Sequence, residues 1–276
     1  MSEALPRFLY GTAWKEDRTE ALVRLALDAG FRGIDTANQR RHYFEAGVGA
    51  AVAAAQERGL VRREDLFLQT KFTSLGGQDH RLPYDAAADP ATQVRQSFQS
   101  SLEHLGTDYV DSYVLHGPSS ARGIPAGDWA VWRAMEDLHR AQKTRRLGVS
   151  NVSLEQLVTL HEGSAVKPAF VQNRCFARNR WDGEVRRFCA KTGMLYQGFS
   201  LLTANPRALA SPAVAAAARR TGRTGAQVVF RFALEVGMLP LTGTTSPRHM
   251  EEDLGAFEFA LLPPEVEAIE ACEAPG

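Results

Sequence analysis

The chain has 276 residues, of which 44% are hydrophobic and 23% are charged, proportions typical of a soluble globular protein. Lysine plus arginine and aspartate plus glutamate both number 32, so the formal net charge is zero. No basic excess indicates a nucleic-acid or acidic-membrane surface. The composition therefore favours a small-molecule partner, with no nucleic acid and no membrane.

Signals for export, membrane insertion or metal binding are missing from the sequence. Residues 1–7 lack the apolar core of a signal peptide, and no apolar run reaches the roughly 18 residues of a membrane span. Cys175, Cys189 and Cys272 form no CxxC pair, and the seven histidines lack ligand spacing. We expect a cytoplasmic protein with reduced thiols and no metal.

Short apolar runs alternate with helical patterns along the chain. Strands are expected at residues 8–12, 33–36, 66–71, 109–115, 145–149, 169–172, 194–200 and 237–242. Helical patterns lie between them at 18–29, 45–57, 94–105, 129–138, 213–219 and 225–235, then from Pro247 and at 264–273. The loop over 72–90 is long enough that we expect a functional role for it.

Eight strand–helix units of roughly 30 residues without a break in composition predict a single (β/α)8 TIM barrel, an α/β fold, as one domain over residues 1–276. A doubly wound sheet is the alternative. Its dinucleotide fingerprint is absent after the first strand, where the sequence reads Gly11-Thr12-Ala13-Trp14. No Gly-rich phosphate loop occurs either.

Ionisable side chains end three consecutive expected strands. Asp35, Lys71 and His116 end the second, third and fourth strands, and Tyr43 lies in the loop after the second. The active sites of such barrels lie at the carboxyl ends of the strands. The four side chains are therefore expected to converge on one rim.

These residue types suit protonation of an oxygen while a carbonyl is reduced. A lysine ammonium is expected to lower the pKa of a nearby tyrosine from about 10, and an aspartate keeps that lysine charged. A histidine can orient the carbonyl or share the proton. The hydride has to come from a cofactor. A barrel aldolase or isomerase that uses Lys71 as a Schiff base is another interpretation.

Four motifs in order resemble those of the aldo-keto reductases. They are Gly33-Ile34-Asp35-Thr36-Ala37, Leu68-Gln69-Thr70-Lys71, the run from Tyr109 to His116, and Leu147-Gly148-Val149-Ser150-Asn151. The resemblance extends from Gly11 to Leu254. It implies a (β/α)8 barrel and reversible, NAD(P)H-dependent reduction of an aldehyde or ketone to an alcohol.

The resemblance also implies roles for individual residues. Asp35, Tyr43, Lys71 and His116 would be the catalytic tetrad with Tyr43 as general acid, and Trp14 would join Tyr43 and His116 in the substrate pocket. Ser150, Asn151 and Gln172 would bind the nicotinamide carboxamide, and Phe199 would stack on the ring. Further cofactor contacts would come from Thr12, Asp35, Ser200, Leu202, Gly243, Thr244, Thr245, Arg248, His249, Glu252 and Asp253.

The loop between Asp35 and Tyr43 departs from the common spacing of the family. Counting from the aspartate puts Arg40 at the place of the tyrosine, whereas alignment from Glu45 and Val48-Gly49 favours Tyr43. The longer loop is similar to that of a largely fungal branch. His42 is the next candidate for the proton donor.

The part of the expected cofactor site that would hold the phosphate also departs from the common sequence of the family. Gly243 stands where many members have a lysine, and His249 where they have an arginine. We expect NADPH, with NADH as the alternative.

The sequence ends soon after residues 264–273, without the long C-terminal loop of many members, so an open pocket is expected. A monomer or weak homo-oligomer is expected, and an NAD(P)H-binding sensor or partner subunit with little turnover is the alternative function.

Overall fold

A closed barrel of eight parallel strands forms the centre of the molecule. The computed structural model describes residues 5–273. Each strand pairs with the next in the sequence, and the last pairs with the first through Leu9 and Leu241. The predicted (β/α)8 barrel is confirmed. The strands are β1 (Leu9–Gly11), β2 (Gly33–Asp35), β3 (Phe67–Phe72), β4 (Ser112–Leu115), β5 (Leu147–Ser150), β6 (Phe170–Arg174), β7 (Leu195–Phe199) and β8 (Met238–Thr242).

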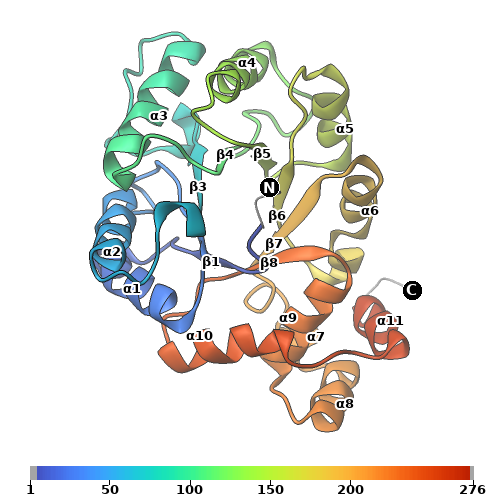
Figure 1. Cartoon of the computed structure of the whole chain (residues 1–276). Helices are drawn as coiled ribbons and strands as arrows, with labels where there is room; N and C mark the ends of the chain where they lie inside the picture. Colours follow the sequence, from blue (N-terminus) through green and yellow to red (C-terminus); the bar gives the residue numbers. More distant parts are fainter. Residues whose placement is uncertain (1–4, 274–276) are drawn as a thin grey trace.

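Helices surround the strands on the outside (Figure 1). Six of them alternate with the first seven strands: α1 (Thr19–Ala29), α2 (Glu45–Glu57), α3 (Pro90–Leu105), α4 (Ala126–Arg140), α5 (Leu154–Gly163) and α6 (Gly183–Thr192). Between β7 and β8 lie α7 (Pro206–Leu209), α8 (Pro212–Thr221) and α9 (Gly225–Glu235). After β8 come α10 (Pro247–Leu254) and α11 (Pro263–Ala271).

Helix α3 shows how local sequence sets the ends of an element. The carboxylate of Asp89 accepts a hydrogen bond from the backbone N–H of Thr92 at 3.1 Å, and Pro90 occupies the first turn. Gly106 ends the helix in a left-handed conformation with φ of 63°. The cap makes the helix begin four residues before the predicted start at residue 94.

The fourth strand is shorter than predicted, and the extension over residues 109–111 is wrong. Val110 makes only an isolated bridge to Thr144. Asp111 instead accepts a hydrogen bond from the backbone N–H of Leu68 at 2.9 Å and pairs with Arg63 and Arg145 at 2.9 Å and 3.0 Å. Because of these bonds, regular pairing of β4 with β3 begins only at Ser112.

The barrel interior is apolar at one end and polar at the other. Leu9, Phe67, Phe170 and Leu239 form a separate apolar cluster inside the barrel. Two residues further along β3 and β6 the side chains are Gln69 and Gln172, both buried. Because side chains alternate along a strand, these glutamines face the same interior one layer nearer the carboxyl ends. The apolar layer closes the barrel floor beneath a polar layer.

Among residues 5–273, no helix is both long and apolar enough to cross a membrane. Within the same range, no group of three or more histidine, cysteine, aspartate or glutamate side chains is arranged to hold a metal ion. The single domain predicted over 1–276 includes residues 1–4 and 274–276, which lie outside the described part, and it stays a prediction.

A buried tryptophan attaches the C-terminal helix α11 to the barrel. Trp181 donates its indole N–H to the backbone oxygen of Ile269 at 3.0 Å, and its ring lies 5.1 Å from that of Phe232. Arg180, Trp181 and Asp182 all have positive φ, between 51° and 56°. Left-handed backbone costs roughly 1–2 kcal/mol for each such residue, so the burial of Trp181 must offset this strain.

Replacing Trp181 with alanine should lower the free energy of unfolding by about 3–5 kcal/mol, because it removes a large buried ring and its hydrogen bond. Urea unfolding measures the change. Trp14→Ala is the matched control: Trp14 is 68% exposed, and its loss should cost about 1 kcal/mol or less. Equal losses for the two variants would contradict the attachment role.

Candidate functional site

A buried ion pair between Lys71 and Asp35 lies at the centre of the candidate site. The ammonium of Lys71, fully buried, donates to the two carboxylate oxygens of Asp35 at 2.7 Å and 2.8 Å. Its third hydrogen goes to the backbone oxygen of Thr36 at 2.8 Å. Burial lowers the pKa of Lys71, and Asp35 opposes that shift. With every N–H bonded, Lys71 is arranged as a fixed cation, and this geometry does not favour the Schiff-base interpretation.

Tyr43 and His116 lie against this pair. The ammonium of Lys71 is 5.1 Å from the centre of the Tyr43 ring, and the rings of Tyr43 and His116 are 5.9 Å apart. Burial, with a smaller effect of Asp35, raises the pKa of Tyr43. The expectation that Lys71 lowers the pKa of this phenol is wrong, because burial and Asp35 raise that pKa instead. The phenol is therefore protonated at neutral pH, as a proton donor requires.

His116 is held as a neutral ring. Burial lowers its pKa to about 3, and the positive charge of Lys71 and then His42 add to the effect. Its Nδ1 lies 2.6 Å from the hydroxyl oxygen of Thr73, two residues after Lys71. When Thr73 donates to Nδ1, the ring proton lies on Nε2, which leaves that nitrogen as the donor.

The loop that carries Tyr43 is held by the loop after β3. Gln39 donates its side-chain N–H to the backbone oxygen of Gly77 at 2.6 Å, and Gln78 donates to the backbone oxygen of Asn38 at 2.9 Å. The backbone N–H of Tyr43 returns to the oxygen of Gln39 at 3.0 Å. The loop over 72–90 thus fixes the segment in which the chain departs from the family spacing.

The alternatives to Tyr43 point elsewhere. The guanidinium of Arg40 lies over the ring of Phe44 at 4.6 Å. The ring of His42 packs on that of Trp14, with 3.9 Å between ring centres. The residue beside Lys71 is Tyr43, so the structure favours the alignment from Glu45 over the one counted from the aspartate.

The residues expected to hold a nicotinamide carboxamide lie beside the ion pair, and one of them, Gln172, bonds to it directly. Ser150 donates its hydroxyl to the backbone oxygen of Gln172 at 2.6 Å. Gln172 in turn donates its side-chain N–H to Asp35 at 3.0 Å. Asn151, with φ of 54°, donates its side-chain N–H to the backbone oxygen of His116 at 2.9 Å. The three side chains therefore lie along β5 and β6 beside the candidate catalytic residues.

Aromatic and apolar groups follow at the end of β7. Phe199 is the last residue of the strand and is partly exposed, and Ser200 follows with φ of 57°. The guanidinium of Arg174 is 6.0 Å from the centre of the Phe199 ring. Leu202 packs partly against the core. Phe199 thus offers an accessible ring at the rim.

A lysine that the sequence did not single out lies at the end of β8. Lys15, in the loop after β1, donates its ammonium to the backbone oxygen of Gly243 at 2.7 Å. Its side chain is buried, and burial lowers its pKa to about 8, with a contribution from Arg18. Lys15 thus places an ammonium beside Gly243, the position at which many family members have a lysine. The only sign of a role for Lys15 in the sequence was its position directly after Trp14, a predicted residue of the substrate pocket.

The expected phosphate residues around α10 divide into two sets. Thr244 and Thr245 lie at the rim, and Arg248 is exposed, 3.4 Å from Glu252 and 3.3 Å from the ring of His249. These groups can reach a ligand. Two other predicted cofactor residues have protein partners: the hydroxyl of Thr12 donates to the backbone oxygen of Asp35 at 3.0 Å, and the carboxylate of Asp253 accepts from Thr242 at 2.7 Å. Thr12 and Asp253 support the rim rather than line it.

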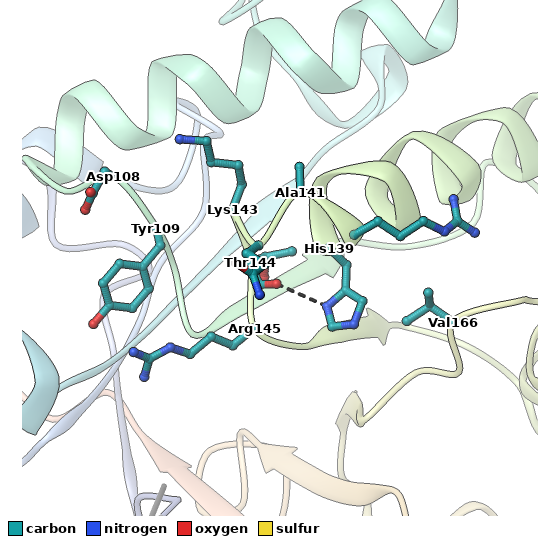
Figure 2. Close-up of a pocket in the computed structure, with 10 residues that line it drawn as sticks. Asp108, Tyr109, His139, Ala141, Lys143, Thr144, Arg145 and Val166 are labelled. Atoms are coloured by element: carbon teal, nitrogen blue, oxygen red, sulfur yellow. Dashed lines mark hydrogen bonds between the residues drawn. The ribbon is translucent and has the colours of Figure 1, made fainter.

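A surface pocket of about 840 Å³ lies away from this site, at the N-terminal ends of β4 and β5. Figure 2 shows His139 and Thr144 in it, with the His139 ring bonded to the backbone oxygen of Thr144 at 3.1 Å. It contains none of the predicted site residues.

Comparison with known proteins decides the family. The sequence matches the Aldo/keto reductase family over residues 9–274. The chain belongs to the aldo-keto reductases. It is 30% identical to aldo-keto reductase AKR2E4 of Bombyx mori over 275 residues, covering 94% of this chain and 84% of that protein. It is 28% identical to the uncharacterized oxidoreductase YtbE of Bacillus subtilis over 269 residues, covering 97% and 89%. Membership of the longer-loop branch stays a prediction.

Solved aldo-keto reductases share the barrel. The Bombyx mori AKR2E4 structure, in complex with NADP, superposes with a TM-score of 0.82 at 26% identity and covers 96% of this chain and 88% of that one. The Brucella melitensis aldo/keto reductase gives a TM-score of 0.81 at 28% identity, covering 97% and 95%. A structure of aldo-keto reductase AKR2E5 complexed with NADPH gives 0.82 at 25% identity, covering 98% and 85%.

Burial of Asp253 generates a prediction about pH. Burial raises the pKa of this carboxyl to about 7, against the effect of the Thr242 hydrogen bond. Because the unfolded chain loses this proton near pH 4, the folded state is penalised progressively as the pH rises from about 4 to about 7.

Asp253→Asn should therefore raise the free energy of unfolding by about 1–3 kcal/mol at about pH 8 and by about a third as much at about pH 5. Urea unfolding of the protein without cofactor at the two pH values measures this. Asp17→Asn, at an exposed position, is the control and should behave alike at both. An equal effect of Asp253→Asn at the two pH values would contradict the assignment.

Proposed function

We propose that this aldo-keto reductase is an NADPH-dependent carbonyl reductase that converts an aldehyde or ketone to an alcohol, and the reverse. The observation that carries the proposal is the placement of the Tyr43 phenol beside the buried Lys71–Asp35 pair and the His116 ring. Relatives solved with NADP and NADPH support the choice of cofactor.

The residues at the rim fit a nicotinamide dinucleotide by their chemistry. Phe199 presents a ring for stacking, and Gln172 and Asn151 retain amide oxygens that can accept from a carboxamide. Lys15 and the start of α10 place positive charge near the end of β8, where phosphates would lie. Bound NADPH supplies the hydride.

The proton step follows from the geometry of the chain itself. In reduction, Tyr43 gives its phenolic proton to the carbonyl oxygen as the oxygen gains negative charge. Lys71, held by Asp35, stabilises the phenolate that remains. His116 donates from Nε2 to the same oxygen and orients it. In alcohol oxidation each proton transfer runs in the opposite direction.

The setting of the site suits small carbonyl compounds. Trp14 is exposed at the rim and forms an aromatic wall with His42. We propose that the protein works as a cytoplasmic monomer or weak homo-oligomer on such substrates. Tight cofactor binding without turnover on any carbonyl would instead indicate the sensor function.

Tyr43→Phe should lower kcat for NADPH-dependent reduction of a panel of aldehydes by roughly 10²–10⁴-fold, because the proton donor is lost. Cofactor absorbance measures the rate. His42→Ala, which removes the neighbouring ring, should leave kcat within about tenfold of that of the parent protein. Full activity of Tyr43→Phe with an inactive His42→Ala would transfer the role of proton donor to His42.

Lys15→Met should weaken NADPH binding by about tenfold or more, because a charge-assisted contact to a phosphate is lost. Tryptophan quenching measures the affinity, and Lys143→Met, an exposed lysine outside the site, is the control. Weaker binding of NADPH alone assigns Lys15 to the 2′-phosphate, whereas equal weakening of NADH assigns it to the pyrophosphate. Unchanged affinities for both would contradict the proposal.

A further inference from the structure

Three buried glutamines surround the carboxylate of Asp35 inside the barrel. Gln69 on β3, Gln172 on β6 and Gln197 on β7 are each at most 3% exposed. One oxygen of Asp35 accepts from the side-chain N–H groups of Gln69 at 2.7 Å and Gln172 at 3.0 Å, in addition to Lys71. The carboxylate is therefore bonded by amides as well as by the ammonium.

The charge of Asp35 dictates how all three amides are oriented. An ionised carboxylate only accepts hydrogen bonds, so Gln69 and Gln172 must present their NH₂ groups to it. Their second hydrogens go to the side-chain oxygen of Gln197, at 2.7 Å and 2.9 Å. Gln197 then donates its own N–H to the side-chain oxygen of Gln69 at 3.0 Å. The amides form one connected network with a single consistent orientation.

We propose that Gln69 and Gln197 are positioning residues of the candidate site: together they hold Asp35 as an anion and so keep the ammonium of Lys71 charged beside Tyr43. The catalytic part of this inference rests on the proposed function. Gln69 acts directly on the carboxylate, whereas Gln197 acts through the amides of Gln69 and Gln172.

The physical reason lies in the cost of a buried ion pair. Removing two charges from water is unfavourable unless additional hydrogen bonds satisfy them. Without the amide donors, the ionised carboxylate is less stable, and transfer of the proton from Lys71 to Asp35 becomes easier. A neutral Lys71 would no longer stabilise the phenolate that Tyr43 leaves in carbonyl reduction.

The network also restricts Gln172. Both hydrogens of its amide are used, by Asp35 and by Gln197. Its side-chain oxygen is the only amide group left for a ligand, so Gln172 can accept from a nicotinamide carboxamide but cannot donate to it. Asp35 and Gln197 thereby fix which end of that carboxamide Gln172 can bind.

The charge of Lys71 can be followed without cofactor or substrate. The chain has five lysines, so the side-chain signals of protein labelled at lysine are few, and Lys71→Met identifies the one of interest. Asp35, Tyr43, Glu45 and His116 surround Lys71 and stay unchanged in the variants.

Gln69→Met and Gln197→Met should each lower the fraction of Lys71 that is charged near pH 7, because the proton moves from Lys71 to Asp35 when the amide donors are lost. If either single variant fails to fold, the double variant Gln69→Met/Gln197→Met is used in its place, because it leaves fewer amide groups unpaired. Ser112→Ala is the matched control, because Ser112 pairs in register with Gln69 and its buried hydroxyl has no partner among the described residues. A Lys71 side chain that stays fully charged near pH 7 in a folded variant would overturn the proposal.

Kinetics separates this inference from the proposed function. In the same glutamine variants kcat should fall about tenfold while the KM for NADPH changes little, because neither glutamine is placed at the cofactor rim. If the charge of Lys71 falls in the variants but the parent protein reduces no carbonyl, the proposed function is contradicted and the role of the glutamines in holding the charge is kept. Turnover by the parent protein with unchanged kcat in the variants would show that the glutamines have no positioning role.

Discussion

The candidate site depends on one buried ion pair. Lys71 and Asp35 lie inside the barrel with almost no exposure, where an unpaired charge would be strongly unfavourable. The two residues therefore need each other, and both need the surrounding donors and acceptors. Thr36 completes the bonds of the ammonium, and Gln69 and Gln172 complete those of the carboxylate. The pair fixes a cation next to a phenol while it adds little net charge.

The two ends of the rim are built by loops that reach across neighbouring elements. At one end, bonds from Gln39 and Gln78 join the loop after β2 to the loop after β3 and deliver Tyr43 to the ion pair. At the other end, Lys15 from the loop after β1 reaches the end of β8 at Gly243. Both contacts lie where the sequence departs from the common pattern of the aldo-keto reductases.

The division of the barrel interior into two layers has a chemical consequence. The apolar floor of Leu9, Phe67, Phe170 and Leu239 excludes water from beneath the amide network. In such surroundings hydrogen bonds are stronger, and unpaired polar groups are costly. The glutamines are therefore held in one orientation, which suits a site that must keep a charge in place between turnovers.

Sequence alone determined the repeating strand–helix pattern and the residues that end strands β2, β3 and β4, because side-chain periodicity and strand ends are local properties. Asp35, Lys71 and His116 could be named for that reason. The sequence left Arg40, His42 and Tyr43 as competitors, and it contained no sign that Gln69 contacts Asp35 or that Gln197 bonds to Gln69 and Gln172. Those contacts join residues far apart in the chain. Only closure of the barrel and the bonds between loops decided them.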